Sequence, residues 1–204
     1  MKRNQTTSMI LGMLSIEPHR SGYDIRKAVE SSVSYFWRES YGQIYPTLKR
    51  LAAEGLIIPR RSSSRGRPER QEYSLSAKGR TYLREWLAAP HRIQPPRSEF
   101  LLKLFFGRSA SPHVCVQHVR KFQDDSKRLL ASLLEIEKQA PAHNAGNPHL
   151  PFWLLTLSFG IALTRASIEW SGSALAKLAG SKAGAAVGRR KKAALKTPSP
   201  SRRI

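Results

Sequence analysis

The sequence has few residues of several kinds, and each shortage excludes a class of protein. A single cysteine, Cys115, among 204 residues excludes an internal disulfide and is typical of a reducing compartment. Acidic residues are scarce, with 14 Asp and Glu against 35 Lys and Arg, so the formal net charge is +21. Residues 173–204 hold nine basic side chains and no acidic one. Such a balance predicts a polyanionic partner.

Long apolar runs are also missing. The longest extends from Phe152 to Leu163, which is too short to cross a bilayer, and Arg165 and Glu169 follow it closely. We therefore expect a buried helix there and no membrane partner. The first residues show neither a sustained apolar run nor a cleavage site, so we expect no signal peptide and a cytoplasmic location.

Catalytic and metal-binding patterns are missing as well. The sequence contains no nucleophile motif, no paired catalytic carboxylates and no phosphate loop between a strand and a helix. His113, Cys115 and His118 lie close together, but their spacing matches no common zinc pattern. We expect no enzyme activity, no metal and no cofactor.

The segment Glu39–Ile58 carries the most informative helical pattern. Ser40 and Gln43 have capping-box spacing, which predicts a helix start, and Gly55 predicts its end. An apolar stripe of Ile44, Leu48, Leu51 and Ala52 faces inward. The opposite face carries Gln43, Lys49 and Arg50, with Tyr45 at its edge; Gln and Arg suit base edges and Lys suits phosphates. An ordinary solvated helix face is the alternative.

Two short strands, Leu56–Arg60 and Gln71–Leu75, are predicted after this helix. The segment that includes their connection is rich in Ser, Gly and Arg, and its arginines are Arg60, Arg61, Arg65, Arg67 and Arg70. Their mutual repulsion would be relieved by phosphates or by a narrow minor groove. A solvated loop is the alternative.

Helices at 8–15, 21–32 and 40–54, followed by a hairpin, are the order of a winged helix-turn-helix. The blocks G-Y-D-I, I-Y-P-T-L-K-R-L-A-A-E-G-L-I and G-R-P-E-R resemble the PadR family of bacterial transcriptional regulators over residues 11–87. The resemblance implies that Tyr23 and the helix carrying Gln43, Tyr45, Lys49 and Arg50, capped by Ser40, meet the major groove. It also implies that the arginine-rich wing meets the backbone or the minor groove. Glu69 and Glu72 depart from the family pattern.

A long helix after Ser111-Pro112 carries a heptad pattern. Cys115, Val119, Phe122, Ser126, Leu129, Leu133, Ile136 and Ala140 alternate in steps of four and three, which predicts a coiled-coil seam. We expect Val119, Phe122, Leu129, Leu133 and Ile136 to form the interface of a homodimer. The alternative is packing of this helix against the last helix of the same chain.

The expected fold class is mainly α with a small β-hairpin wing. We predict a winged helix-turn-helix domain at 1–90, a proline-rich linker at 91–97, a helical dimerisation domain at 98–172 and a disordered basic tail at 173–204. The aromatic residues Trp86, Phe100, Trp153 and Trp170 are candidates for a pocket that takes a small aromatic or hydrophobic effector, or they belong to the core.

These features lead to a functional hypothesis with two rivals. The main hypothesis is a homodimeric repressor that binds a pseudo-palindromic site in double-stranded DNA of the bacterial nucleoid, with release by a small-molecule effector in some members of the family that it resembles. The first rival is an architectural nucleoid-associated protein with little sequence specificity. The second is a protein-interaction adaptor that uses the heptad seam alone.

Overall fold

A computed structural model of the chain describes residues 5–37, 41–62, 70–91 and 97–180. The chain divides into two compact units, Met1–Gln94 and Pro95–Ile204. Residues 92–96 of the predicted linker lie outside the described residues.

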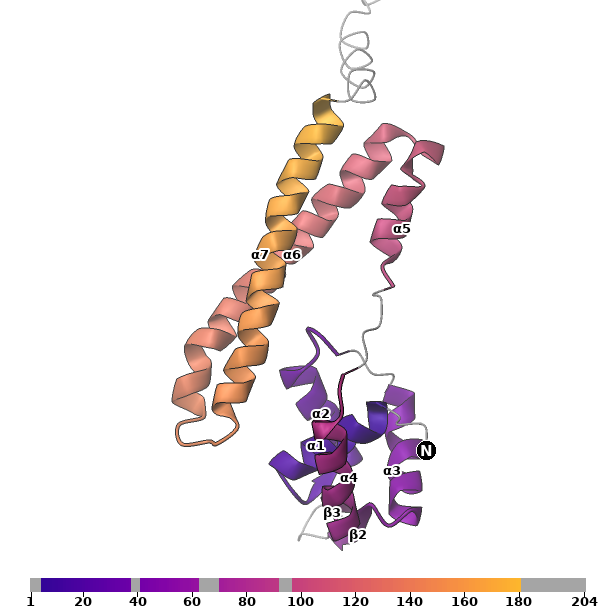
Figure 1. Cartoon of the computed structure of the whole chain (residues 1–204), viewed down its shortest axis with the longest axis vertical. Helices are drawn as coiled ribbons and strands as arrows, with labels where there is room; N and C mark the ends of the chain where they lie inside the picture. The colour runs from indigo at the N-terminus through magenta and orange to yellow at the C-terminus, as the bar shows by residue number, and fades with distance from the viewer. Residues whose placement is uncertain (1–4, 38–40, 63–69, 92–96, 181–204) are drawn as a thin grey trace, which may run out of the picture. The chain divides into compact units, whose positions relative to one another are not determined.

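The first unit combines helices with a small sheet (Figure 1). In chain order its elements are α1 (Gln5–Ile16), β1 (Arg20–Ser21), α2 (Gly22–Ser32), the 3-10 turn η1 (Tyr41–Gln43), α3 (Ile44–Ala53), β2 (Ile57–Ser62), β3 (Arg70–Leu75) and α4 (Ala77–Ala88). The predicted three helices followed by a hairpin are confirmed. This is the element order of a winged helix.

The sheet is antiparallel and has the strand order β1-β3-β2. Ile57 pairs with Leu75 at one end of the hairpin and Ser62 with Arg70 at the other. The third strand, β1, was not predicted, because two residues are too few to show an alternating pattern. Ser21 of β1 pairs with Glu72, so the central strand β3 joins the hairpin to the start of α2.

The core of this unit gathers the inward faces of all its helices and the sheet. Its buried members are Ile10, Leu11, Leu14, Ile25, Ile44, Leu48, Leu51, Leu56, Ile57, Leu75 and Leu83. Ile44, Leu48 and Leu51 are fully buried, as the predicted inward stripe of α3 requires. The opposite face of α3 is therefore directed away from the core.

The second unit is helical. It contains α5 (Glu99–Phe105), the 3-10 turn η2 (Gly107–Ser109), α6 (Pro112–His143) and α7 (Leu150–Gly180). The two long helices lie side by side as a hairpin (Figure 1), and Gly146 in their connection has a positive φ of 76°. Helices of 32 and 31 residues are about 45 Å long at 1.5 Å per residue.

Helix α7 is longer than its sequence pattern predicted. The basic tail was expected to begin at residue 173, but α7 continues to Gly180. Ala174, Leu175, Lys177 and Leu178 have high helix propensity, so the helix extends past the last apolar residue of the predicted domain. The rest of the predicted tail lies outside the described residues.

Candidate nucleic-acid interface

Helix α3 begins later than the predicted capping box. Ser40 lies outside the described residues, and the helix starts at Ile44 with Gln43 as N-cap and no side-chain cap bond. The reason is Pro46, which has no N–H to donate and is tolerated only in the first turn, where the backbone donors have no partner within the helix. A start at residue 44 places Pro46 in that turn.

The outward face of α3 is exposed as predicted. Gln43, Tyr45 and Lys49 are exposed on it, and Tyr23 of the neighbouring α2 is also exposed. The face thus brings together an amide, an ammonium and phenol groups, which can bond to base edges and to phosphates.

Tyr45 is held in place by a residue without a side chain. A Cβ built on Gly22 would lie 2.7 Å from Cε1 of Tyr45, so the ring rests directly on the backbone at the start of α2. Partial burial raises the pKa of the Tyr73 hydroxyl, and the neighbouring Tyr45 raises it further. The aromatic ring of Tyr45 therefore lies where α2, α3 and β3 meet.

Arg50 differs from the other predicted contacts of α3. Its Nη1 donates to Oε1 of Glu54 at 2.8 Å, and its Nη2 donates to Oγ1 of Thr7 at 2.7 Å. Thr7 lies in α1 and is buried. Arg50 therefore ties α3 to α1, and its guanidinium is already engaged within the protein.

The end of α3 is fixed by the start of α4. Gly55 has a φ of +69°, and the N–H groups of Gly55 and Leu56 return to the carbonyls of Ala52 and Leu51, which is a Schellman motif. Ser76 donates its hydroxyl to the carbonyl of Gly55 at 2.7 Å. The predicted glycine cap is confirmed, and α4 anchors it.

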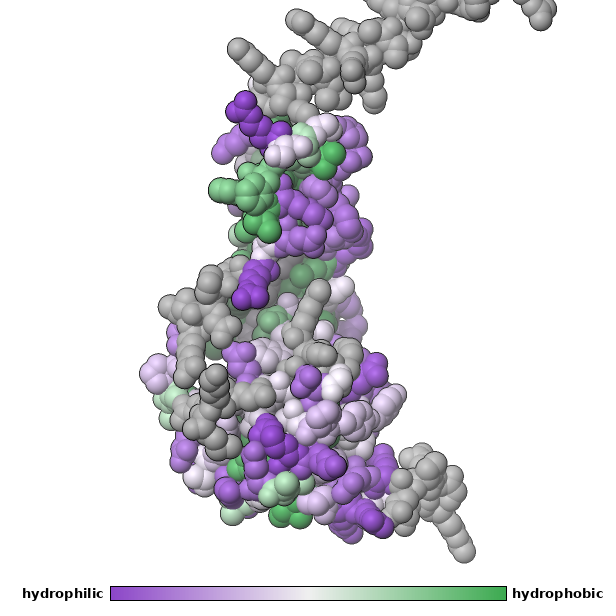
Figure 2. All heavy atoms as spheres, turned by 90° about the vertical axis from the view of Figure 1, so that its right-hand side faces the viewer, coloured by the Kyte–Doolittle hydropathy of each residue, from purple (hydrophilic) through white to green (hydrophobic). Residues whose placement is uncertain are grey.

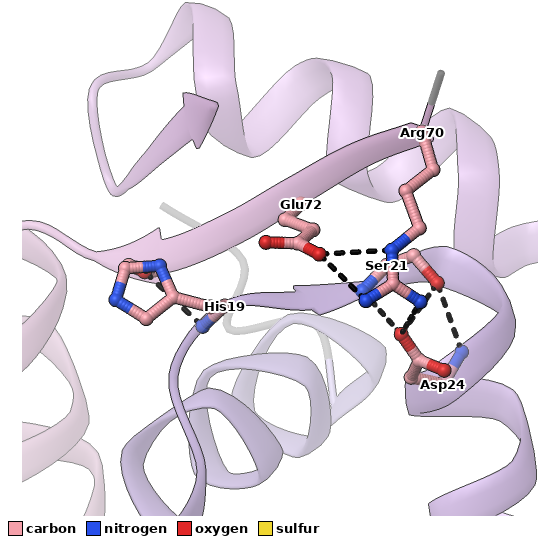
Figure 3. A network of polar contacts seen from close by, with 6 residues as sticks. His19, Ser21, Asp24, Arg70 and Glu72 are labelled. Atoms are coloured by element: carbon pink, nitrogen blue, oxygen red, sulfur yellow. Dashed lines mark hydrogen bonds and ion pairs between the residues drawn. The ribbon is translucent and has the colours of Figure 1, made fainter. Parts of the chain in front are cut away.

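Strand β2 carries two of the predicted wing arginines, and both Arg60 and Arg61 are exposed. Arg65 and Arg67 lie outside the described residues. Arg70, at the start of β3, is engaged with two carboxylates: its Nε donates to Oε1 of Glu72 at 2.9 Å, and its Nη1 lies 3.8 Å from Oδ2 of Asp24 (Figure 3). The predicted set of wing arginines therefore includes one whose charge is paired inside the protein.

Asp24 belongs to the capping box of α2. Ser21 accepts a hydrogen bond from the backbone N–H of Asp24, and the Asp24 carboxylate accepts bonds from the backbone N–H and the hydroxyl of Ser21. Burial acts to raise the pKa of Asp24, but these bonds and the charges of Arg70 and Arg20 outweigh it and lower the pKa below its ordinary value.

The heptad seam of α6 is partly used within the chain. Val119 and Leu133 are fully buried, and α6 packs along α7. Leu129 and Ile136 are 39% and 46% exposed, and Phe122 is half-buried. The prediction that all five residues form a homodimer interface is therefore corrected for Val119 and Leu133, because the seven-residue period also suits two helices of one hairpin.

Two of the three predicted pocket residues of the second unit, Phe100 and Trp170, lie together, and Trp153 does not join them. Phe100 stacks on Phe122 with ring centroids 4.3 Å apart, and Trp170 meets Phe100 edge-on at 5.8 Å. Trp153 stacks on His149 instead, 17 residues or about 25 Å before Trp170 along the same helix. Trp86 belongs to the first unit. Phe100, Phe122 and Trp170 therefore form an aromatic cluster in the second unit.

An exposed apolar face runs along α7, and α5 also exposes apolar side chains. The exposed apolar residues of α7 are Phe152, Leu155, Phe159, Leu163 and Trp170. Those of α5 are Leu101, Leu102 and Phe105, and Phe106 follows directly after the helix. All of them are more than 40% exposed. Figure 2 shows apolar atoms at the surface of the helical unit beside hydrophilic ones. The expectation of a buried helix is therefore wrong for this face of α7. By length and composition alone α7 is also long and apolar enough to cross a membrane.

Metal ligands do not gather in the described part of the chain, where no group of three His, Cys, Asp or Glu side chains could hold an ion. The arrangement that remains is a winged-helix unit with an exposed polar helix face, joined in sequence to an α-helical unit with an apolar face. This combination defines a DNA-binding protein of the winged-helix class.

Comparisons with known proteins agree with this class. Residues 10–85 match the transcriptional regulator PadR-like family, and residues 96–179 match the virulence activator alpha C-terminal family. The chain is 28% identical to the negative transcriptional regulator PadR of Bacillus subtilis over 174 residues, which covers 83% of this chain and 94% of that protein.

Solved structures extend the likeness to the fold. The crystal structure of B. subtilis PadR in complex with operator DNA has a TM-score of 0.75 at 27% identity and covers 86% of this chain and 99% of that one. The structure of the same protein in complex with p-coumaric acid has a TM-score of 0.68 at 28% identity and covers 84% and 97%. Residues 10–85 carry the match to the PadR-like family, and the chain over most of its length is similar to PadR-type transcriptional regulators. It is a DNA-binding regulator, and the architectural nucleoid-associated alternative is set aside.

Proposed function

We propose that this chain is a sequence-specific repressor whose α3 enters the major groove of an operator. The exposed face of α3, with Gln43, Tyr45 and Lys49, is the observation that carries the proposal. A Gln amide can pair bidentately with adenine, and Lys suits a phosphate. Arg60 and Arg61 of β2 are exposed and supply the cations of the wing. The complex of the B. subtilis relative with operator DNA supports this assignment.

The proposed repressor is a homodimer. The exposed apolar face of α7 and α5 is of the kind that an interface covers, and Leu129 and Ile136 of α6 add exposed apolar side chains. A second copy of the chain would bury this face and present a second α3. Two such helices read half-sites about 34 Å apart, which is one turn of the duplex, so the operator is expected to be pseudo-palindromic.

The experiment that tests the proposal is a competition binding assay. A DNA fragment from the region upstream of the protein's own gene should bind at least about a hundredfold more tightly than random DNA at physiological salt. Sedimentation should give twice the 22.9 kDa mass of one chain. A preference of less than about tenfold would contradict a sequence-specific repressor.

A small aromatic effector is the second part of the proposal. The cluster of Phe100, Phe122 and Trp170 offers stacking partners in the helical unit, and the B. subtilis relative has been crystallised with p-coumaric acid. We expect phenolic acids to quench Trp170 fluorescence and to release the operator. A Trp170→Phe variant, compared with Trp153→Phe, would assign the signal to this cluster.

The cellular setting follows from the same proposal. The relatives are bacterial DNA-binding regulators, so we place the protein in the cytoplasm on chromosomal DNA, without enzyme activity of its own. The exposed apolar face of α7 is then covered by a second copy rather than by lipid. Recovery of the protein in the soluble fraction as a dimer would agree with this placement.

A further inference from the structure

Arg70 occupies a wing position but directs its whole guanidinium at carboxylates. Its Nε and Nη2 lie 2.9 Å and 2.8 Å from Oε1 of Glu72, and its Nη1 lies 3.8 Å from Oδ2 of Asp24 (Figure 3). All three nitrogens therefore face anionic partners within the protein.

The charge around Arg70 does not favour a phosphate. Arg20 contributes a second guanidinium, which donates to the backbone carbonyl of Asp24 at 3.4 Å and is paired with Glu17. Across this group, the carboxylates of Glu17, Asp24 and Glu72 outnumber the guanidinium groups of Arg20 and Arg70. The positive charge of Arg70 is therefore already balanced by carboxylates within this group.

The burial of Glu72 makes its ion pair with Arg70 important for stability. It is 7% exposed, on the central strand of the sheet, and a buried carboxylate is costly to leave without a partner. Arg70 itself is 53% exposed as a side chain, and an exposed ion pair alone would contribute little. The burial of Glu72 is what makes Arg70 hard to remove.

The pairing links two parts of the DNA-binding unit. Arg70 is the first residue of β3 and pairs with Ser62, the last residue of β2. It therefore lies at the end of the hairpin where the two strands are connected. Asp24 lies in the first turn of α2, within its capping box and next to the exposed Tyr23. One guanidinium thus connects the end of the hairpin to the start of α2.

We propose that Arg70 is a positioning residue that fixes the wing strands against the start of α2 through Glu72 and Asp24, and that it is not a phosphate contact. The inference rests on the proposed operator binding. Among the described residues of the wing, it leaves Arg60 and Arg61 as the proposed DNA contacts. It assigns a role to Glu72, whose position in a basic wing is otherwise unfavourable for DNA.

The test compares operator affinities of the full-length Arg70→Ala, Glu72→Gln and double variants. If Arg70 positions the wing, Glu72→Gln weakens operator binding by about fivefold even though it removes a negative charge, and the double variant is no weaker than Arg70→Ala. If Arg70 contacts a phosphate, Glu72→Gln frees it and strengthens binding. That result would overturn the proposal, as would unchanged affinity in both single variants.

Amide hydrogen exchange of the free protein tests the same point without DNA. Both single variants should raise exchange in residues 57–62 and 70–75 while leaving the core helices α1 and α3 of the same unit unchanged, which also shows that this unit remains folded. Unchanged exchange in the two strands would contradict the positioning role. Arg60→Ala is the matched control. Because Arg60 is exposed and proposed to contact DNA, its removal should lower the operator affinity and the dependence of that affinity on salt concentration, without changing hydrogen exchange.

The two proposals fail in different ways. If the wild-type protein shows no preference for an operator, the proposed function fails, and the exchange experiment still reports on Arg70. If the wild type prefers an operator and Lys49→Ala binds it more weakly, but Glu72→Gln binds it more tightly, only the role of Arg70 is wrong.

Discussion

The ring of Tyr45 lies on the backbone of Gly22, where a Cβ would come within 2.7 Å of Cε1 of the ring. Tyr45 is 59% exposed, so the contact fixes one face of the ring and leaves the rest to solvent. The orientation of a side chain on α3, the proposed DNA-reading helix, is thus set by a residue at the start of another helix. A small residue at position 22 is a condition for that orientation.

Gly22→Ala should therefore lower both operator affinity and stability. The added methyl group displaces the exposed Tyr45 ring and lies 3.2 Å from Cδ1 of the buried Leu48, so the unfolding free energy should fall by about 1–3 kcal/mol, and the displaced ring loses its position on the proposed DNA-facing side. Thermal unfolding and operator titration separate the two effects. Gly12→Ala is the control: a Cβ there meets no atom within 4 Å, so affinity should not change. Equal affinity of both variants would show that the orientation of Tyr45 is unimportant.

Lys49 and Arg50 are neighbours in sequence and should behave differently on substitution. Lys49→Ala should weaken binding to all DNA sequences and lower the salt slope by about one per bound subunit, with no change in melting temperature. Arg50→Ala breaks the bonds to Thr7 and Glu54 and should reduce the unfolding free energy by about 1–2 kcal/mol.

Salt titrations and denaturant unfolding of both variants measure these effects. Lys138→Ala, exposed on α6, controls for loss of charge alone. A drop in stability for Lys49→Ala, or none for Arg50→Ala, would reverse the two assignments.

The elements of the fold could be predicted from local patterns, while the partners of charged residues could not. Periodicity and Gly55 defined the inward stripe and the end of α3, because both depend on neighbouring residues. The engagement of Arg50 with Thr7 depends on a residue 43 positions away, and that of Arg70 with Asp24 depends on strand pairing. No local pattern distinguishes an arginine that faces DNA from one that faces a carboxylate.

The heptad pattern of α6 illustrates a second limit. A seven-residue period shows that an apolar seam exists but does not identify the helix that covers it. Here Val119 and Leu133 are covered by the same chain, and Leu129 and Ile136 are exposed. The apolar surface that remains for a second copy is found mainly on α7 and α5, and the sequence of α7, apolar on nearly all sides, could not reveal which side is exposed.

Phe159→Asp should separate the proposed dimer without unfolding the chain, because the side chain is 68% exposed on α7. Leu133→Asp should instead unfold the helical unit, since Leu133 is 1% exposed and a charge cannot be buried there without a partner. Sedimentation and circular dichroism distinguish a folded monomer from an unfolded chain. Ser158→Asp, exposed beside Phe159 on the same helix, should remain dimeric. A dimeric Phe159→Asp variant would place the interface elsewhere.

Acid should weaken the first unit partly through Asp24. Its pKa in the folded protein lies below the ordinary value of 3.8, so Asp24 adds stability above its unfolded pKa, and this contribution is lost as the pH falls through the folded pKa. Asp24→Asn should therefore be less stable than the wild type at pH 7, and the difference should shrink as the pH approaches 3. Denaturant unfolding across this range measures it. Ser21→Ala removes the hydroxyl hydrogen bond to the carboxylate and keeps the one from the backbone N–H, so it should raise the pKa of Asp24 in an NMR titration; a pKa that did not rise would show that the backbone bond and the arginines lower it.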